Sequence, residues 1–328
     1  MHSKRKKENS KMPFVSIIIA AFNAETYIPS CLEAILNQKL TNVEVLIVDD
    51  GSTDSTASLC DKYATRDLRI KVFHEPHKGV AHARQVGIDH ASGKYTIHID
   101  ADDQFEATML EEMFKAAENT DSDILICDYN ELRNTKIVYH SQKPSALKNE
   151  AIANDLITGK LYGALWNKMI RTSSFKDNHV RFREVLRMRE DIFFILDLLP
   201  HVKKIAYLPK AFYTYNRISN NASLTNKYLT EDKNYYDQEI RWCLIALENP
   251  LVSEKQKTRL RISLLNYAYV TLSGQIYNRE EWFSLFSPHK SLFKTVNSGY
   301  KKIIVILGLS GHFRLASIIR RLITFIKK

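Results

Sequence analysis

The chain has 328 residues, of which 45% are apolar and 10% aromatic, and it carries a formal net charge of +10. This composition excludes a disordered or fibrous protein, and the length suits one large domain with an appendage, or two domains. The excess of positive charge favours an anionic partner, for which nucleic acid, anionic lipid and a phosphate-bearing ligand all qualify.

Residues 1–12 are basic and polar, and we expect them to form a disordered tail. The apolar run that follows ends at Phe22 and is too short for the core of a secretion signal. No stretch approaches the ~18 uninterrupted apolar residues of a spanning helix, so none is predicted. The cysteines form no C-x-x-C pair, which indicates free thiols in a reducing compartment: Cys31, Cys60, Cys127 and Cys243.

Short apolar runs alternate with segments of helical periodicity through the first 128 residues. The runs predict five strands: Phe14–Ala20, Val43–Val48, Ile70–Phe73, Lys94–Ile99 and Asp123–Cys127. Helices are expected between them, for example over Val80–Ala91. This alternation predicts an α/β fold, a Rossmann-like and mostly parallel central sheet with helices on both faces.

Ligands of such sheets bind beyond the carboxyl ends of the strands. The first predicted strand ends at Ala21 and Phe22, the second at Asp50, and the fourth at the sequence Asp100-Ala101-Asp102-Asp103. We therefore expect these three segments to meet at one crevice.

The pattern becomes irregular after residue 130. A helix is expected over Asn149–Thr158, another opens at Glu190, and residues 226–300 have a helical, polar pattern. The predicted division is a tail over 1–12, a main domain over 13–225, a helical region over 226–300 and a basic amphipathic helix over 301–328.

The glycine-rich phosphate loops of nucleotide-binding folds are missing from this crevice. The first strand is followed by A-A-F-N-A-E instead of G-x-G-x-x-G, and Gly93-Lys94 lacks the rest of a phosphate loop. A divalent cation is another means of holding phosphates, and carboxylates suit Mg²⁺ or Mn²⁺. Alternate residues of an extended chain point the same way, so Asp100 and Asp102 could face one ion. A polar turn with solvated aspartates remains the alternative.

Several segments taken together resemble family 2 glycosyltransferases of the GT-A fold. They are V-S-I-I-I-A-A-F-N-A-E-T-Y-I, V-E-V-L-I-V-D-D-G-S-T-D-S-T, H-K-G-V-A-H-A-R-Q-V-G-I, I-D-A-D-D, L-W-N-K-M-I-R and R-E-D-I-F-F. The resemblance covers about residues 13–220. It implies transfer of a sugar from a nucleotide diphosphate donor with inversion at the anomeric carbon.

The resemblance also implies roles for individual residues. Ala21, Phe22 and Glu25 match the donor-nucleotide loop, and Asp50 matches the carboxylate that binds the base. Lys78, Gly79 and Arg84 match a loop and helix start near the nucleotide. Asp100, Ala101 and Asp102 match the D-x-D motif, which contacts ribose and a Mn²⁺ or Mg²⁺ ion, and Asp103 could share either role. Asp191 matches the catalytic base, with Glu190 as the alternative. Phe22 and Gln85 depart from the tyrosine and asparagine usual in the family.

Two tryptophans are ambiguous, since a tryptophan can serve as a sugar-stacking platform or as ordinary core. We interpret Trp166 as a platform and Trp242 as core. Acids in the first turn of a helix are favoured by the helix dipole alone, so Glu190 and Asp191 also have a purely structural interpretation.

The last segment, residues 301–328, predicts a helix that lies in an anionic membrane surface. One face carries Leu315, Ile318, Ile319, Leu322 and Ile326, and the opposite face Arg314, Ser317, Arg321, Thr324 and Lys328. Packing of this helix on the protein's own core is the alternative. Membrane contact would place the protein in the cytoplasm, peripherally on the inner face of the cell membrane.

The function predicted is therefore a metal-dependent transfer from a UDP-sugar to a glycan or lipid-linked acceptor in cell-surface polysaccharide synthesis. The main rival is a catalytically inactive nucleotide-sugar-binding scaffold in a glycosyltransferase complex. A sugar nucleotidyltransferase would need a glycine- and arginine-rich loop after the first strand. A nucleic-acid partner is not expected, because no recognition motif appears. A second copy of the chain as partner is left open.

Overall fold

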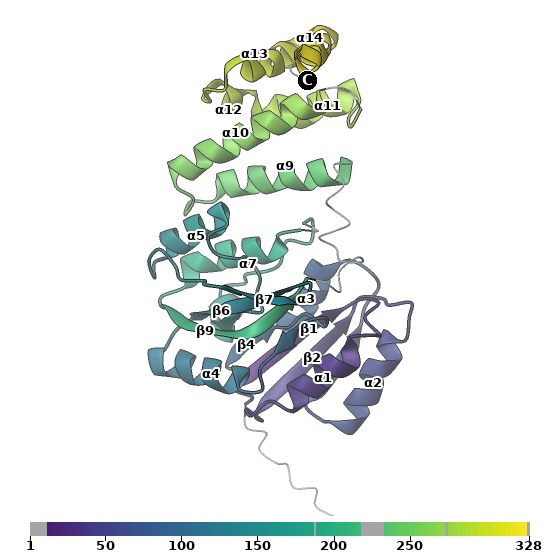
Figure 1. Cartoon of the computed structure of the whole chain (residues 1–328), viewed down its shortest axis with the longest axis vertical. Helices are drawn as coiled ribbons and strands as arrows, with labels where there is room; N and C mark the ends of the chain where they lie inside the picture. Colours follow the sequence, from purple (N-terminus) through teal and green to yellow (C-terminus); the bar gives the residue numbers. More distant parts are fainter. Residues whose placement is uncertain (1–11, 187, 218–232, 273–274, 327–328) are drawn as a thin grey trace, which may run out of the picture. The chain divides into compact units, whose positions relative to one another are not determined.

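The computed structural model describes residues 12–186, 188–217, 233–272 and 275–326. The chain divides into two compact units (Figure 1): one contains Met1–Ile152 and Gly159–Asn220, the other Ala153–Thr158 and Asn221–Lys328. Nearly all of the predicted tail, residues 1–11, lies outside the described residues.

A central sheet organises the first unit. Its described strands are β1 (Val15–Ala21), β2 (Val43–Asp49), β3 (Ile70–His74), β4 (Tyr95–His98), β5 (Gln104–Phe105), β6 (Ile124–Arg133), β7 (Lys136–His140), β8 (Lys168–Arg171) and β9 (Ile205–Asn216). They follow the order β3-β2-β1-β4-β8-β6-β9-β5, and β7 pairs with β6. The pairings among β1 to β4 are parallel, as is the long pairing of β6 with β9. The mostly parallel α/β sheet predicted from the sequence is confirmed.

Helices flank this sheet, as Figure 1 shows. The helices of this part of the chain are α1 (Ile28–Leu36), α2 (Thr56–Arg66), α3 (Val80–His90), α4 (Met109–Thr120), α6 (Thr172–Lys176) and α7 (Glu190–Leu198), and the 3₁₀ turn η1 (Leu199–His201) follows α7. Helix α5 (Asn149–Thr158) is divided, since its residues Ala153–Thr158 belong to the second unit.

Both faces of β1 are buried, because successive side chains of a strand point to opposite sides. Ile17 and Ile19 belong to one apolar cluster with Leu32 of α1. Ile18 points the other way, toward α3, where Gly87 leaves room for it. A Cβ at Gly87 would lie 2.4 Å from Cγ2 of Ile18. This two-sided burial explains why the strand is an unbroken apolar run.

The sequence patterns predicted only β6 in the second half of the sheet and missed its other strands. Antiparallel β8 lies between β4 and β6, and β9 brings residues beyond 205 back beside β6. The predicted fifth strand extends to Arg133 and forms a hairpin with β7. The end of β9 thereby reaches the aspartate segment, since Asn216 donates its backbone N–H to Oδ1 of Asp103 at 2.7 Å.

The second unit is helical. It contains α9 (Lys233–Glu248), α10 (Glu254–Thr271), α11 (Arg279–Phe286), η3 (Ser287–His289), α12 (Lys290–Lys294), α13 (Gly299–Leu307), the wider turn η4 (Gly308–His312) and α14 (Phe313–Ile326). Helix α10 contacts α9, α11, α12 and α13. Trp282 is fully buried here and donates its indole N–H to the carbonyl of Ala268 at 3.0 Å.

Among the residues described, the run Gly299–Thr324 is long and apolar enough to cross a membrane by length and composition. No such run was predicted from the sequence. The run is interrupted, however, because Ser310 and Gly311 have non-helical backbone angles and Gly311 has φ +96°. Helices α13 and α14 contact each other on either side of this break. The predicted single helix over 301–328 is thus two helices joined by a kink.

Candidate active site

The segments that follow β1, β2 and β4 lie side by side, as the topology predicted. The backbone N–H of Asp50 donates to the carbonyl of Ala21 at 2.8 Å, and the N–H of Ile99 donates to the carbonyl of Ile18 at 2.9 Å. Parallel strands of similar length end at the same edge, so their trailing loops meet there. Glu25 strengthens this junction, because its carboxylate accepts the backbone N–H of Ser55 at 2.9 Å.

Asp50 holds the loop that leads into α3. Its carboxylate is buried and accepts the backbone N–H groups of Lys78 at 2.8 Å and Gly79 at 2.9 Å. Gly79 has φ +100°, a conformation that favours glycine, and precedes the first residue of α3. Asp50, Lys78 and Gly79 therefore form one hydrogen-bonded cluster, in which the carboxylate fixes the path of the loop.

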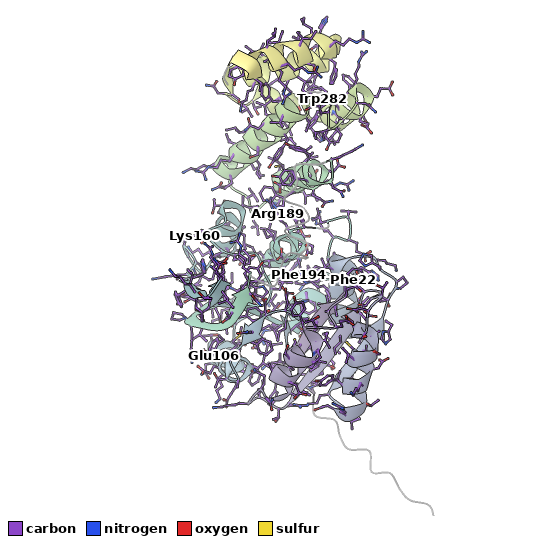
Figure 2. All side chains as sticks on the ribbon, turned by 45° about the vertical axis from the view of Figure 1, so that its right-hand side comes forward. Phe22, Glu106, Lys160, Arg189, Phe194 and Trp282 are labelled. Carbon is purple, nitrogen blue, oxygen red and sulfur yellow. The ribbon has the colours of Figure 1, made fainter. Side chains whose placement is uncertain are left out.

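His77 also belongs to this cluster, although it was not predicted as a site residue from the sequence. Its Nδ1 lies 2.9 Å from the Asp50 carboxylate. Its ring stacks on Phe22, with centroids 4.1 Å apart and an interplanar angle of 22°. Phe22 is labelled in Figure 2 and is 42% exposed. The two rings present an apolar face beside a carboxylate, an arrangement suited to a flat, polar-edged ligand such as a nucleobase. His77 could have been found from the sequence, because it directly precedes Lys78 and Gly79.

Arg84 links the aspartate segment to the first turn of α7. Its guanidinium donates to Oε1 of Glu190 at 2.5 Å and to Oδ1 of Asp100 at 3.2 Å. Arg84 and Glu190 are buried, whereas the Asp100 side chain is 37% exposed. Burial opposes the charge of Arg84, but Glu190, Asp100 and Asp191 outweigh that effect and raise its pKa.

Glu190 and Asp191 have different surroundings although they are adjacent. Burial raises the pKa of Glu190, against the opposing charge of Arg84. Asp191 is half-buried, and its Oδ1 accepts the backbone N–H of Ile192 at 2.7 Å. Arg189, labelled in Figure 2, precedes the helix with φ +60°, a left-handed conformation uncommon for a side chain of this size. This sharp entry into α7 places the two acids at the start of the helix.

The aspartate segment is a turn and not an extended strand end. Strand β4 ends at His98, and the N–H of Asp103 donates to the carbonyl of Asp100 at 3.3 Å. The expectation that Asp100 and Asp102 alternate on an extended chain is therefore wrong. The turn still gathers three carboxylates within four residues, with Ala101 at its corner.

Asp103 is the buried member of this turn. No described donor meets its Oδ2 atom in hydrogen-bond geometry, although the Tyr213 hydroxyl lies beside it. Burial, together with the charges of Asp100 and Asp102, raises the pKa of Asp103 to about 8. A nearby cation stabilises the ionised form of such a carboxylate and lowers its pKa. In the described part of the chain, however, no three His, Cys, Asp or Glu side chains are grouped so that they could hold a metal by themselves. A metal here would need further donors, such as ligand phosphates and water.

Aromatic residues lie behind the turn. Trp166 stacks on Tyr213 with centroids 4.5 Å apart, and the Tyr213 hydroxyl accepts the N–H of Asp100 at 3.1 Å. Trp166 is only 2% exposed. The interpretation of Trp166 as an exposed sugar platform is therefore wrong, because its ring is core that supports the turn.

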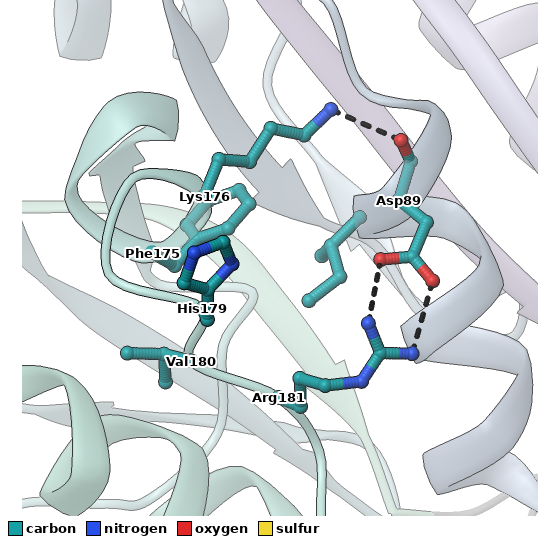
Figure 3. Close-up of a pocket in the computed structure, with 7 residues that line it drawn as sticks. Asp89, Phe175, Lys176, His179, Val180 and Arg181 are labelled. Carbon is teal, nitrogen blue, oxygen red and sulfur yellow. Dashed lines mark hydrogen bonds and ion pairs between the residues drawn. The ribbon is translucent and has the colours of Figure 1, made fainter.

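A pocket lies elsewhere in this unit, next to the end of α3 (Figure 3), and contains none of the predicted site residues. Its cations already have partners: Lys176 donates to the carbonyl of Asp89, and Arg181 pairs with the Asp89 carboxylate. These contacts indicate a structural role for the pocket lining.

Residues 16–178 match the family described as Glycosyl transferase family 2. A Haemophilus influenzae protein named as an uncharacterized glycosyltransferase is 30% identical over 223 residues, which cover 66% of this chain and 84% of that protein. EpsH of Bacillus subtilis, named among the glycosyltransferases, is 34% identical and is covered to 60%, with 62% of this chain matched. The cholesterol galactosyltransferase of Borreliella burgdorferi is 30% identical over 61% of this chain and 59% of that protein. The chain thus spans about 60% of several curated relatives.

Solved structures share the fold. TarS 1-349 of S. aureus in complex with UDP-GlcNAc has a TM-score of 0.66 at 21% identity, covering 94% of this chain and 91% of that one. The mannosyltransferase PcManGT of Pyrobaculum calidifontis, in complex with GDP-Man and Mn²⁺, has a TM-score of 0.53 at 13% identity, covering 95% and 85%. These similarities support the GT-A fold expected from the sequence.

Proposed function

The chain belongs to glycosyltransferase family 2, and we propose that it transfers a sugar from a UDP-sugar, with inversion, to a hydroxyl of a glycan or lipid-linked acceptor. The observation that carries this proposal is the Arg84 bridge, which joins Asp100 to Glu190 and so brings the D-x-D turn close to Asp191. A donor-binding motif and a base must lie on either side of one reacting carbon, and this bridge connects their two segments.

In the proposed reaction the acceptor oxygen forms a bond to the anomeric carbon while the bond to the diphosphate breaks on the opposite face. The electron pair of that bond leaves with the nucleoside diphosphate. Asp191 takes the acceptor proton, because an alcohol is a weak nucleophile until it loses that proton. Glu190 is the weaker choice for this role, since its carboxylate is buried against Arg84.

The turn of Asp100, Asp102 and Asp103 fits a hard divalent cation. It supplies carboxylate oxygens, and burial together with the charges of Asp100 and Asp102 raises the pKa of Asp103. Asp102, with Asp100 and Asp103 beside it, would hold Mn²⁺ or Mg²⁺ together with the donor diphosphate. The ion would offset the charge that develops on the leaving group.

The nucleotide half of the donor is assigned to the segments after β1 and β2. Ala21 lies at the end of β1, and the stacked pair of Phe22 and His77 would offer one flat face to a base near Asp50. A uracil presents a ring N–H, which suits a carboxylate acceptor. Lys78 is exposed, and its charge would suit a donor phosphate. Glu25 would act indirectly, by fixing the loop.

Membrane contact through α14 is part of the proposal. We define the α14 ridge as Leu315, Ile318 and Leu322, which are 50%, 55% and 56% exposed. Their spacing places them on one side of the helix, while Ala316 and Ser317 are buried. These three side chains are therefore turned outward, whereas the helix packs on its own unit through Phe313 and Ala316.

The charge of this region suits an anionic lipid surface. From Trp282 to Lys328 the chain has nine lysines and arginines and no aspartate or glutamate. Arg314 and Arg321 are exposed and lie along one edge of the α14 ridge. An apolar stripe bordered by arginines is the pattern of a helix lying in a membrane interface. A membrane site on the inner face of the cell membrane would bring the enzyme to lipid-linked acceptors, and the name of the Borreliella relative includes a lipid acceptor.

Donor binding and turnover test the proposal. We expect UDP, with Mn²⁺ present, to raise the melting temperature, and at least one UDP-sugar to be consumed, measured as released UDP. The scaffold alternative predicts UDP binding without turnover of any sugar donor. Absence of binding to every uridine, guanosine and thymidine diphosphate would remove both hypotheses.

A further inference from the structure

Tyr162 is a surface residue held in an unusually fixed position. Its side chain is 41% exposed, and it belongs to the short segment between α5 and β8. The backbone N–H of Tyr162 donates to Oε1 of Gln142 at 2.7 Å, and its carbonyl accepts from Nζ of Lys168 at 2.8 Å. Gln142 is 5% exposed and Lys168 only 1%.

A buried lysine is costly for a protein unless its donors are satisfied. Nζ of Lys168 donates also to the carbonyl of Ala164 at 2.6 Å and to Oδ1 of Asn167 at 2.8 Å. Two of its three partners are therefore backbone carbonyls of the segment that carries Tyr162. Two buried polar side chains, Gln142 and Lys168, thus hold the backbone of this segment, although the Tyr162 ring is exposed.

The fixed segment packs directly on the start of α7. Gly163 is so close to Ile192 that a Cβ on the glycine would lie 2.2 Å from Cγ1 of Ile192. Tyr162 directly precedes Gly163, and Asp191 directly precedes Ile192. The contact between Gly163 and Ile192 therefore brings the segment of Tyr162 beside the proposed base. The charges of Asp191 and Asp100 both contribute to the environment of the Tyr162 hydroxyl, where burial raises its pKa.

Other aromatic rings support the Tyr162 ring from behind. Its centroid lies 5.5 Å from that of Tyr129, 5.7 Å from Trp166 and 6.2 Å from Tyr215. Trp166 and Tyr129 are buried, whereas Tyr162 is the most exposed member of this cluster. A ring that is backed on one side and open on the other can offer a flat apolar face to a ligand.

We propose that the exposed face of Tyr162 is the acceptor platform, on which the pyranose ring that carries the attacking hydroxyl stacks beside Asp191. A pyranose has one face of C–H groups and an edge of hydroxyls, so stacking on tyrosine fixes the ring while its hydroxyl edge stays free. The Asp100 turn and its diphosphate would lie on the other side of that hydroxyl. This inference rests on the proposed transferase function and identifies its acceptor as a sugar ring.

Stacking of a pyranose needs the aromatic face of Tyr162 and not its hydroxyl, so the test variants remove one or the other. Tyr162→Ala removes the face, Tyr162→Phe keeps it, and Tyr300→Ala removes a tyrosine of similar exposure, 38%, from the other unit. Each protein is first loaded with UDP and Mn²⁺, and the UDP affinity is measured by calorimetry. Methyl hexopyranosides of the gluco, galacto and N-acetylglucosamine series then serve as acceptor probes in saturation-transfer NMR.

We expect the wild type, Tyr162→Phe and Tyr300→Ala to bind at least one pyranoside with similar affinity, and Tyr162→Ala to bind it about three- to tenfold more weakly. UDP affinity of Tyr162→Ala should stay within about twofold, which shows that the fold is intact. Equal pyranoside affinity of Tyr162→Ala and wild type, loss of binding in Tyr162→Phe, or no pyranoside binding by UDP-loaded wild type would overturn the platform. Failure of the proposed function is a separate result, because the wild type would then bind no UDP and consume no sugar donor.

Discussion

Arg84 donates to Oε1 of Glu190 at 2.5 Å, and this contact joins α3 to α7 across 106 positions of sequence. Both side chains are buried, and the same guanidinium also reaches Asp100. The pair therefore acts as a positioning device for the D-x-D turn and for the start of α7. It also distinguishes two adjacent acids, because Glu190 pairs with Arg84, whereas Asp191 has no arginine partner of its own among the ion pairs described.

Breaking this pair should cost stability. Glu190→Gln leaves Arg84 as a buried charge with one carboxylate fewer, and removing one partner of a buried pair costs about 3–5 kcal/mol. The free energy of unfolding, measured by urea titration, should fall by that amount. Asp197→Asn is the matched control, since it breaks the more exposed pair with Arg183 and should cost about 1 kcal/mol or less. Equal losses in the two variants would contradict a special role for the Arg84 pair.

The D-x-D turn should make UDP affinity depend on a divalent cation. Asp102→Asn should weaken UDP binding about tenfold or more when Mn²⁺ is present and change it little in EDTA, because the carboxylate acts through the ion. Calorimetric titration of UDP under both conditions measures this difference. Asp89→Asn serves as the control, because its carboxylate pairs with Arg181 near the remote pocket. Metal-independent UDP affinity in the wild type would refute the cation site.

Lys168 should give the protein a distinctive pH dependence. Burial lowers its pKa to about 7, against the opposing charge of Asp191, whereas an unfolded lysine has a pKa of about 10.4. Between these values the unfolded chain holds a proton that the folded chain lacks. The free energy of unfolding should therefore rise with pH by up to about 1.4 kcal/mol per pH unit from this residue, starting near pH 7.

Lys168→Met isolates that contribution. The variant should be less stable overall, since three acceptors lose a donor, but its stability should rise less than that of the wild type between pH 7 and pH 9. Urea unfolding of both proteins at these pH values gives the two slopes. Parallel slopes would show that Lys168 is protonated in the folded state throughout this range.

The α14 ridge should control binding to anionic vesicles. Ile318→Glu with Leu322→Glu should lower sedimentation with phosphatidylglycerol-containing liposomes strongly, because it places charge on the apolar stripe. Arg314→Gln with Arg321→Gln should weaken binding about tenfold or more, at about 1 kcal/mol per charge near the surface. Leu68→Glu is the control, since Leu68 is 96% exposed in the other unit. Unchanged binding of both double variants would remove the membrane role.

Much of the first half of the fold could be predicted from local patterns. The strands β1 to β4 are short, largely apolar runs, and the helix expected over Val80–Ala91 lies between two of them, so residue order alone located these elements. The convergence of Asp50 with the aspartate turn followed from the rule that parallel strands end at one edge. The later strands had a weaker signal, because β7 is an exposed edge strand and β8 has only two apolar residues, which lie between a lysine and an arginine.

The site residues divide in a similar way. Motif positions selected Arg84, Asp191 and the aspartates as candidates, whereas only the contacts between distant segments show what each side chain touches. Glu25 ties a loop, Trp166 is core, and His77 stacks on Phe22. Tyr162 is the clearest case, because its position depends on Gln142 and Lys168, which lie 20 residues before it and 6 residues after it.

Asp191→Asn tests the central claim most directly. Both proteins are first assayed for UDP binding in the presence of Mn²⁺, where equal affinity shows an intact donor site. Consumption of the preferred UDP-sugar is then compared, with water or a pyranoside as acceptor. A base of this kind contributes about 10²–10⁴-fold, so Asp191→Asn should retain donor affinity and lose at least about a hundredfold in kcat. A variant that binds UDP normally and turns over at most of the wild-type rate would contradict Asp191 as the base of this glycosyltransferase.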